Sequence, residues 1–187
     1  MAAPRRLRRP FFDRPTVRVA RDLLGCRLVR VLPDSLSEAR IVETEAYLTG
    51  DPASHAFRGE TPRNRSMFAR PGTLYVYRIH QVHCANVVTR RGEAVLLRAA
   101  EPLSPWLEDL RGPGRLCRGF GLTRSDDGLD LTRGAVQLWS AREKPGRIVS
   151  APRVGIRLAK ERRLRFAFYG ERWVSSPRPW GRRRVAG

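Results

Sequence analysis

The sequence lacks the features of two large classes of protein, disulfide-stabilised extracellular domains and membrane-spanning chains. Its 187 residues include only three cysteines, odd in number and widely spaced: Cys26, Cys84 and Cys117. Such a set provides no disulfide framework and is typical of a reducing compartment, so a cytoplasmic location is predicted. Apolar runs of eighteen or more residues are also missing, and neither a transmembrane helix nor a membrane partner is expected.

Acidic residues and lysines are scarce. Arginine and lysine together number 37, against 18 aspartates and glutamates, and Lys144 and Lys160 are the only lysines. A GC-rich genome accounts for part of the arginine bias, but a net charge of +19 exceeds what solubility requires. A polyanionic partner is therefore indicated. Nucleic acid is favoured over an anionic membrane surface because no basic amphipathic helix is evident.

The order of the expected elements predicts a single α+β domain. Strand patterns and short helical patterns follow one another without a regular β-α-β alternation, which favours an antiparallel or mixed sheet surrounded by short helices. Strands are expected at residues 38–48, 74–79, 85–89, 94–101, 135–140, 153–159 and 164–170. Residues 16–32 are expected to begin as a short helix and to continue through Gly25 into a further strand. Two more short helices are expected, one at 104–111 and one within 112–122.

Composition also indicates the domain boundaries. Residues 1–10 are basic and are predicted to be a disordered arm, residues 11–176 are predicted to be the folded domain, and residues 177–187 a basic tail. Residues 49–73 contain several prolines and carry no sustained period, which predicts a long loop. Loops of this length in compact domains are usually functional.

Two glutamates stand two residues apart in RIVETEAYL, an expected strand at residues 40–48. Successive side chains of a strand point to opposite faces, so Glu43 and Glu45 should share a face, with Cα atoms about 6.5 Å apart. Three interpretations are open: ion pairs with nearby arginines, a carboxylate pair that hydrolyses a glycosidic bond, and metal ligation. Aromatic residues on the same face and after it favour a site that holds a flat ring and activates water beside it: Tyr47, His55, Tyr75 and Tyr77.

A zinc site is a further possibility, since His80, His83 and Cys84 are close together in the sequence. Structural zinc usually takes four ligands with a second paired cluster. Cys26 and Cys117 are isolated and provide no such pair. No metal and no cofactor are therefore expected.

Six motifs occur in the order and spacing of a known family: RIVETEAYL, TPRNRSMF, PGTLYVY, VLLRAAEPL, GPGRLC and RVGI. In these motifs the sequence resembles the alkyladenine (3-methyladenine) DNA glycosylases, the single-domain family typified by the human enzyme. The resemblance runs from about Ala20 to Ser175, and six motifs in register are highly specific even though each alone is weak. It implies an α+β fold with a curved antiparallel sheet, similar to the C-terminal domain of formyltransferases.

The resemblance also implies the catalytic groups. Glu45 matches the general base that deprotonates the water attacking the sugar C1′. Arg98 matches an arginine that helps to hold this water, and the backbone carbonyl of Val154 is the expected second contact of the water. Because a cationic N-alkylated purine is already a good leaving group, a positioned water and a carboxylate suffice. The role expected for Glu43 is then a structural ion pair or hydrogen bond.

Further matches imply a pocket for a base that has left the DNA stack. Tyr47, His55 and Tyr77 match its aromatic walls, with His55 and the backbone of Ala53 reading the base edge. Asn86 matches the asparagine that crowds the amino group of guanine. A base inside a duplex is reached only after it rotates out of the stack, and electron-rich rings attract a cationic base.

One stretch departs from the family pattern. The family has YxxYGMY followed by one residue and a cysteine, whereas this chain has YRIHQVHC, one residue shorter and without the second and third tyrosines. The second tyrosine of the family enters the gap left by the flipped nucleotide, and either His80 or Gln81 falls at its place here. Histidine is a poorer plug, which predicts altered base flipping. Contacts to DNA phosphates are expected from three arginines: Arg63, Arg65 and Arg115.

The combined prediction is a monomeric enzyme of base excision repair, associated with the nucleoid through DNA binding. It should remove alkylated purines such as 3-methyladenine, and in addition deaminated purines, from double-stranded DNA. A lyase step requires an amine, and neither lysine lies in a segment that matches the pocket, so a monofunctional hydrolase is expected. The alternative is a basic nucleic-acid-binding protein without catalytic activity. A carbohydrate glycosidase would explain the carboxylates but not the charge.

Overall fold

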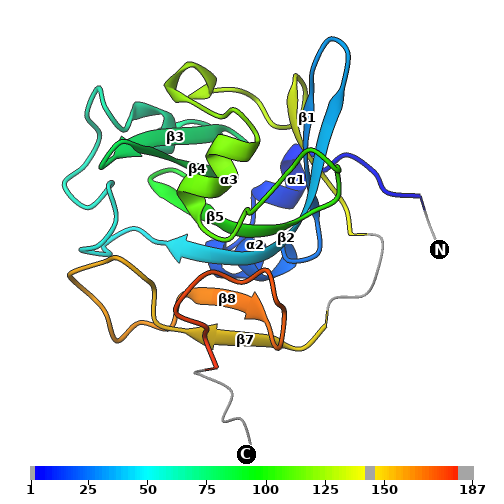
Figure 1. The fold of residues 1–187 in the computed structure, drawn as a ribbon. Helices are drawn as coiled ribbons and strands as arrows, with labels where there is room; N and C mark the ends of the chain where they lie inside the picture. Colours follow the sequence, from blue (N-terminus) through cyan, green and yellow to red (C-terminus); the bar gives the residue numbers. More distant parts are fainter. Residues whose placement is uncertain (1–2, 142–145, 181–187) are drawn as a thin grey trace, which may run out of the picture.

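The twelve-residue strand β2 (Leu36–Tyr47) lies at the centre of the sheet. Strand β5 (Glu93–Pro102) pairs along one edge of β2, whereas β1 (Arg27–Val31) and β8 (Arg165–Phe168) share the other edge. Because β2 changes partner along this edge, the sheet curls, as Figure 1 shows. Within residues 3–141 and 146–180, which are those that the computed structural model describes, every strand pairing is antiparallel.

The other strands extend this centre in both directions. The order is β3-β4-β5-β2-β1-β6, and β7 pairs with β8. Their bounds are Leu74–Ile79 for β3, Val82–Arg90 for β4, Val136–Trp139 for β6 and Ile148–Ala151 for β7. The predicted single α+β domain is confirmed, and of the two kinds of sheet that the sequence left open, the antiparallel one is observed.

The helices are short: α1 (Arg9–Phe12), α2 (Thr16–Asp22), α3 (Pro113–Gly119) and the 3-10 turns η1 (Arg65–Phe68) and η2 (Arg124–Asp126). Among the described residues, no helix is long and apolar enough to cross a membrane. Helix α3 can lie close to the sheet because Gly114 has no side chain. A Cβ there would be 2.9 Å from the Cβ of Val82 in β4.

The two faces of β2 meet different surroundings. Thr44 faces helix α2, where its Oγ1 donates a hydrogen bond to the carbonyl of Ala20 at 2.7 Å. On the opposite face, loops from the last third of the chain cover Glu43 and Glu45, and neither side chain is exposed. A half-exposed strand would alternate buried and exposed residues. This half of β2 is covered on both faces, which explains how carboxylates come to be buried in it.

The helix predicted at 104–111 is wrong. The segment makes a single turn, in which the N–H of Leu107 donates to the carbonyl of Ser104 at 3.1 Å. The hydroxyl of Ser104, the first residue of this segment, accepts a hydrogen bond from the N–H of Glu38 at 2.9 Å. Leu107 and Leu110 are buried in the core. Attachment to the edge of β2 therefore replaces helix formation.

The strand predicted at 153–159 is also wrong. Strand β7 ends at Ala151, and 152–158 is an irregular loop. Gly155 has a φ of +78°, which is incompatible with an extended strand. The apolar residues of this loop therefore do not alternate across a sheet.

The predicted disordered arm is wrong for residues 3–10. The N–H of Leu7 donates to the carbonyl of Leu138 at 2.7 Å, and the Leu7 side chain is buried beside β6. Arg9 forms an ion pair with Asp130 at 2.7 Å. Of the predicted tail at 177–187, the structure describes only the first four residues, of which Trp180 packs against the core. The remainder of the tail lies outside the described residues.

Candidate active site

A cavity of about 570 Å³ opens between the β3–β4 hairpin, β5 and the loops at 49–73 and 152–158. Many of the residues predicted for the site line it together: Tyr47, Ala53, His55, Tyr77, His80, Asn86, Arg98 and Val154. Five other predicted residues are not in its lining: Glu45, Gln81, Arg63, Arg65 and Arg115. The volume and the largely aromatic wall are typical of a site for a small organic molecule or a nucleobase.

Glu45 is fully buried and is not in the lining, but it contacts three residues that line the cavity: Tyr47, Arg98 and Val154. One carboxylate oxygen accepts a hydrogen bond from the N–H of Val154 at 2.9 Å, and the other accepts one from the Tyr47 hydroxyl at 3.0 Å. Arg98 Nη1 is 3.5 Å from the first oxygen. Burial raises the pKa of Glu45, although Arg98 and the two hydrogen bonds oppose this change. Val154 thus presents its N–H to the carboxylate, a contact that the sequence did not predict.

The carboxylate of Glu43 has different partners from that of Glu45. It forms a buried ion pair with Arg165 at 2.5 Å and accepts hydrogen bonds from the N–H and hydroxyl of Ser175 at 2.7 and 3.0 Å. The structural ion pair expected for Glu43 is confirmed. Arg98 lies 3.2 Å from Glu43 as well as beside Glu45, so the prediction that both glutamates share a face is also confirmed.

Arg98 reaches both carboxylates because it occupies a β-bulge. The pairing of β2 with β5 runs from Glu43 opposite Ala99 to Thr44 opposite Leu97, which leaves Arg98 as an extra residue in β5. A bulge redirects the side chain of its extra residue. Here it directs a guanidinium between two buried carboxylates, each of which needs a positive partner in a low-dielectric interior.

Besides Tyr47, two strand residues and one loop residue form an aromatic wall of the cavity. Tyr75 and Tyr77 lie two apart in β3, with ring centroids 5.6 Å apart, and the His55 ring is 4.2 Å from that of Tyr77. His55 Nδ1 is 3.0 Å from the Tyr75 hydroxyl, and Asn64 Nδ2 donates to the His55 carbonyl at 2.8 Å. Burial lowers the pKa of His55, which favours the neutral ring near pH 7. A neutral ring does not repel a cationic guest.

Two further residues predicted to line the pocket are held by backbone groups or neighbouring side chains. Asn86 Nδ2 donates to the carbonyls of Tyr75 and Cys84 at 3.1 and 3.2 Å, so the orientation of the amide is fixed. The N–H of Ala53 donates to Asp51 at 3.0 Å, which fixes the loop at the cavity edge. Both positions are therefore organised before any ligand arrives.

The β3–β4 turn consists of His80 and Gln81, the two residues predicted as candidates for the side chain that enters the gap left by the flipped nucleotide. His80 and Gln81 have φ of +43° and +70°, the left-handed conformation that a two-residue hairpin turn requires. This tight turn accounts for the stretch that is one residue shorter than the family pattern. Both residues are exposed, but only His80 lines the cavity, next to the exposed side chain of Ile79. Gln81 is 3.3 Å from Arg78.

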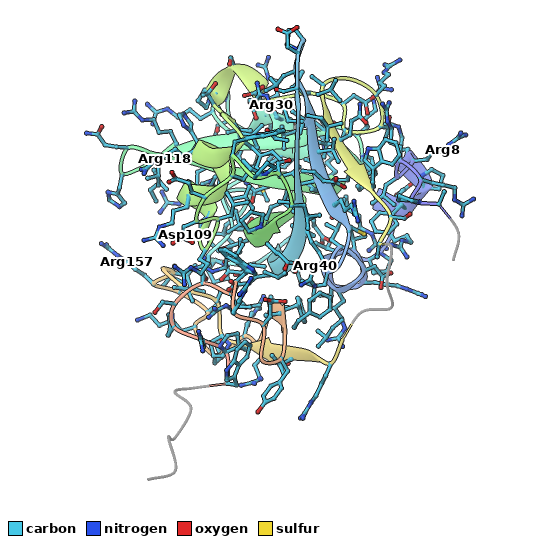
Figure 2. The ribbon with its side chains drawn as sticks, turned by 45° about the vertical axis from the view of Figure 1, so that its right-hand side comes forward. Arg8, Arg30, Arg40, Asp109, Arg118 and Arg157 are labelled. Carbon is cyan, nitrogen blue, oxygen red and sulfur yellow. The ribbon has the colours of Figure 1, made fainter. Side chains whose placement is uncertain are left out.

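Arginines surround the cavity. Arg63 and Arg65 are exposed on the loop and turn before β3, and Arg115 is exposed on α3, where it pairs with Asp109 at 2.5 Å. A cleft of about 810 Å³ on one side includes Arg111, Arg115, Arg118 and Arg178. A second cleft of about 660 Å³ includes Arg58, Arg63, Arg78 and Arg124. In Figure 2, Arg118 and Arg157 lie on the same side of the molecule, opposite Arg8.

Some site residues were missed from the sequence. Asp51 and Arg153 form a fully buried ion pair behind Tyr47, and Arg153 directly precedes Val154. The position of Arg153 inside the RVGI motif was the available signal, but the abundance of arginine hid it. Cys84 also lines the cavity, and its pKa is raised by burial. In the part of the chain that the structure describes, no three His, Cys, Asp or Glu residues are grouped so that they could hold a metal ion.

Comparison with known proteins agrees with this geometry. The family model described as methylpurine-DNA glycosylase (MPG) matches residues 10–172. A protein of Methanoculleus marisnigri is 44% identical over 88% of this chain and 96% of its own length, and one of Anaeromyxobacter dehalogenans is 45% identical over 93% and 87%. A Rhodopirellula baltica protein is 43% identical over 90% and 82%. Each bears the name "Putative 3-methyladenine DNA glycosylase". The chain belongs to the methylpurine-DNA glycosylase family.

Proposed function

We propose that the protein removes alkylated purines, such as 3-methyladenine, from double-stranded DNA by hydrolysing the N-glycosidic bond. One observation carries this proposal above the others. A buried carboxylate, Glu45, is held beside Arg98 directly behind the lining of a cavity large enough for a purine. A basic nucleic-acid-binding module without activity has no need for such an arrangement.

The damaged base would enter the cavity after it leaves the DNA stack. Tyr47 and the His55–Tyr77 pair line the cavity and provide ring surfaces for the purine. Stacking of a base on an aromatic side chain contributes roughly 1–3 kcal/mol. A purine that carries positive charge gains further attraction from tyrosine rings. The amide of Asn86, held by the carbonyls of Tyr75 and Cys84, would crowd the amino group of guanine and so select against the normal base.

Glu45 would activate the water. The water donates its proton to Glu45 as its oxygen forms a bond to the sugar C1′. The C1′–N bond breaks, and its electron pair neutralises the positive charge of the alkylated purine. Arg98 and the backbone at Val154 would help to orient the water, and the ionised carboxylate would stabilise positive charge that develops on the sugar. Free purine and an abasic site are the products.

The reaction would stop at the abasic site. A lyase step needs an amine that attacks C1′. Lys160 is exposed and is not in the cavity lining, and Lys144 lies outside the described residues. We therefore propose a monofunctional glycosylase that acts as a monomer.

The activity can be tested with methylated and undamaged duplex DNA. Incubation with the full-length protein should release 3-methyladenine from methylated duplex and no base from undamaged duplex. Strand breaks should appear only after alkali treatment, because the abasic sites themselves remain uncleaved. Binding without base release would support the alternative, a non-catalytic nucleic-acid-binding protein. Strand breaks without alkali would contradict the monofunctional assignment.

A substitution at the hairpin turn tests the plug. Flipping a base costs a few kcal/mol, least for a base that is damaged or mispaired. We expect His80→Tyr to increase single-turnover release of neutral lesions that pair well, such as hypoxanthine or ethenoadenine, more than release of 3-methyladenine. The larger ring would fill more of the gap and stack better on neighbouring bases.

Gln81→Tyr is the matched control, because Gln81 is adjacent in the same turn but does not line the cavity. It should leave this ratio unchanged. A gain for His80→Tyr that is equal or larger on 3-methyladenine would show that the histidine does not limit flipping. A selective gain for Gln81→Tyr alone would assign the plug to that residue instead.

A further inference from the structure

A buried ion pair supports the cavity from behind. Neither the Arg153 nor the Asp51 side chain is exposed, and Arg153 Nη2 is 3.0 Å from the Asp51 carboxylate. Arg153 Nη1 contacts the same carboxylate and donates to the carbonyl of Ala46 at 3.1 Å. Burial alone would raise the pKa of Asp51, but the hydrogen bonds from Arg153 and Ala53 keep it below its usual value. The pair is therefore ionised and links β2 to two loops.

The guanidinium of Arg153 also supports an aromatic wall. Its central carbon is 4.7 Å from the centroid of the Tyr47 ring, a cation–π contact. Tyr47 lines the cavity, whereas Arg153 and Asp51 are not in the lining. The guanidinium therefore holds the ring from outside the cavity and leaves space inside it for a guest.

The backbone next to Arg153 reaches the carboxylate of Glu45. The N–H of Val154 donates to Glu45 at 2.9 Å. The loop at 152–158 contains no regular secondary structure, and Gly155, Arg157 and Leu158 are exposed. The side chain of Arg153 is thus the anchor that fixes this part of the loop against β2.

One feature of Arg153 argues against a role in stability alone. Its Nε is buried and has no hydrogen-bond partner among the described residues. A buried N–H without a partner destabilises the folded state. A residue whose only role was to fill this space would not require a buried N–H without a hydrogen-bond partner.

We propose that Arg153, paired with Asp51, is a positioning residue that holds the Val154 N–H against the Glu45 carboxylate and the Tyr47 ring against the cavity. The inference rests on the proposed function of Glu45 as general base. Its consequence concerns protonation. Because the N–H of Val154 stabilises the ionised carboxylate, weakening this contact should raise the pKa of Glu45 further.

Other charged or titratable groups also face Glu45. They are Arg98 from β5, Glu43 and the Tyr47 hydroxyl from β2, and Cys84 from β4. Arg98 keeps its contacts to both glutamates, so the carboxylate retains its positive partner. The combined contribution of the Val154 N–H and the Tyr47 hydroxyl, both supported by Arg153, can therefore be measured while Arg98 stays in place.

The test is a pH–rate profile for the double substitution Asp51→Asn/Arg153→Gln, which removes both charges and leaves no unpaired ion. Release of 3-methyladenine from methylated duplex is followed at saturating enzyme, with spontaneous loss at each pH subtracted. This cationic base needs no protonation to leave, so the acidic limb reports the general base. The midpoint should move to higher pH by about one unit, the size expected for loss of a hydrogen bond to a charged group. At one unit below the wild-type midpoint, the variant should then react about tenfold more slowly.

Arg153→Lys provides a second variant with an ionised partner for Asp51. Lysine lacks the flat, bidentate guanidinium, so its midpoint should fall between those of the wild type and the double variant. This variant keeps the test decisive if the double variant does not fold. An unchanged midpoint in Arg153→Lys together with an unchanged midpoint in any folded double variant would overturn the inference.

The matched control is Arg30→Gln/Asp126→Asn, which removes a partly buried arginine–aspartate pair elsewhere in the fold. Arg30 and Arg157, which lines the cavity, are well separated in Figure 2. Comparable loss of melting temperature without a change of midpoint is expected for this control. An equal shift in the control would assign the effect to general destabilisation and overturn the inference. Absence of base release by the wild type would instead contradict the proposed function.

Discussion

Glu45→Gln should abolish base release and leave binding to lesion-containing DNA intact. Glutamine keeps the length and shape of the side chain and can accept a hydrogen bond from Val154, but it cannot take a proton from water. Loss of a general base typically reduces the rate by about 10²–10⁴-fold. Single-turnover release of 3-methyladenine measures the rate, and titration of a duplex that contains a lesion measures binding.

Glu101→Gln is the control for this experiment. Glu101 lies in β5, next to β2, and pairs with Arg40 at 2.6 Å on the surface of the sheet. The substitution makes the same chemical change outside the cavity and should retain wild-type release. If Glu45→Gln turned over at a near-normal rate, the assignment of the base would be incorrect. Glu43 would then be the next carboxylate to test.

Arg165→Met should destabilise the fold strongly. Arg165 is almost fully buried and is the shortest contact of Glu43, which is not exposed at all. Removing one partner of a buried ion pair costs about 3–5 kcal/mol, and here the two buried carboxylates of Glu43 and Glu45 would be left to share Arg98. For a domain of this size, that corresponds to a fall in melting temperature of roughly 6–20 °C. Thermal and urea unfolding measure the change.

Arg163→Met tests whether the effect depends on burial. Arg163 is two residues earlier, is exposed, and contacts only the Ser150 carbonyl among the described residues. Exposed substitutions usually change the free energy of unfolding by less than about 0.5 kcal/mol. Similar losses in both variants would mean that Glu43 does not depend on Arg165. Together with Glu45→Gln, the pair of variants separates the structural glutamate from the proposed catalytic one.

Much of this architecture could be predicted because the relevant signals are local. The period of two along β2 correctly placed Glu43 and Glu45 on one face. Gly25, with a φ of +85°, correctly marked the passage from α2 to β1. The motifs identified residues that the folded chain brings together around one cavity, although they lie on separate elements. Such motifs carry information about spatial proximity that periodicity alone does not contain.

The errors arose where contacts distant in sequence decided the outcome. Residues 104–111 have an acceptable helical pattern, but hydrogen bonds to β2 hold the segment in an irregular path. The arm at 3–10 looked disordered from its charge, yet β6 offers it an edge to pair with. The high arginine content of the chain also prevented the sequence from revealing which arginines are buried near the site. Composition does not distinguish the buried Arg153 and Arg165 from exposed arginines such as Arg163.

The paired irregularities of β2 and β5 determine where these strands tolerate a change of chain length. Val42 is an extra residue in β2 and Arg98 is an extra residue in β5, and together they restore the register by Thr44. A one-residue slip of a strand transfers all its side chains to the opposite face. Deleting Val42 or Arg98 would cause no such slip, because two residues of a bulged strand lie opposite one residue of its partner and the flanking pairs would stay aligned. A deletion elsewhere in the paired part of β2 would turn Glu45 and Tyr47 toward helix α2, so the two extra residues are the positions where the sheet tolerates a change of length.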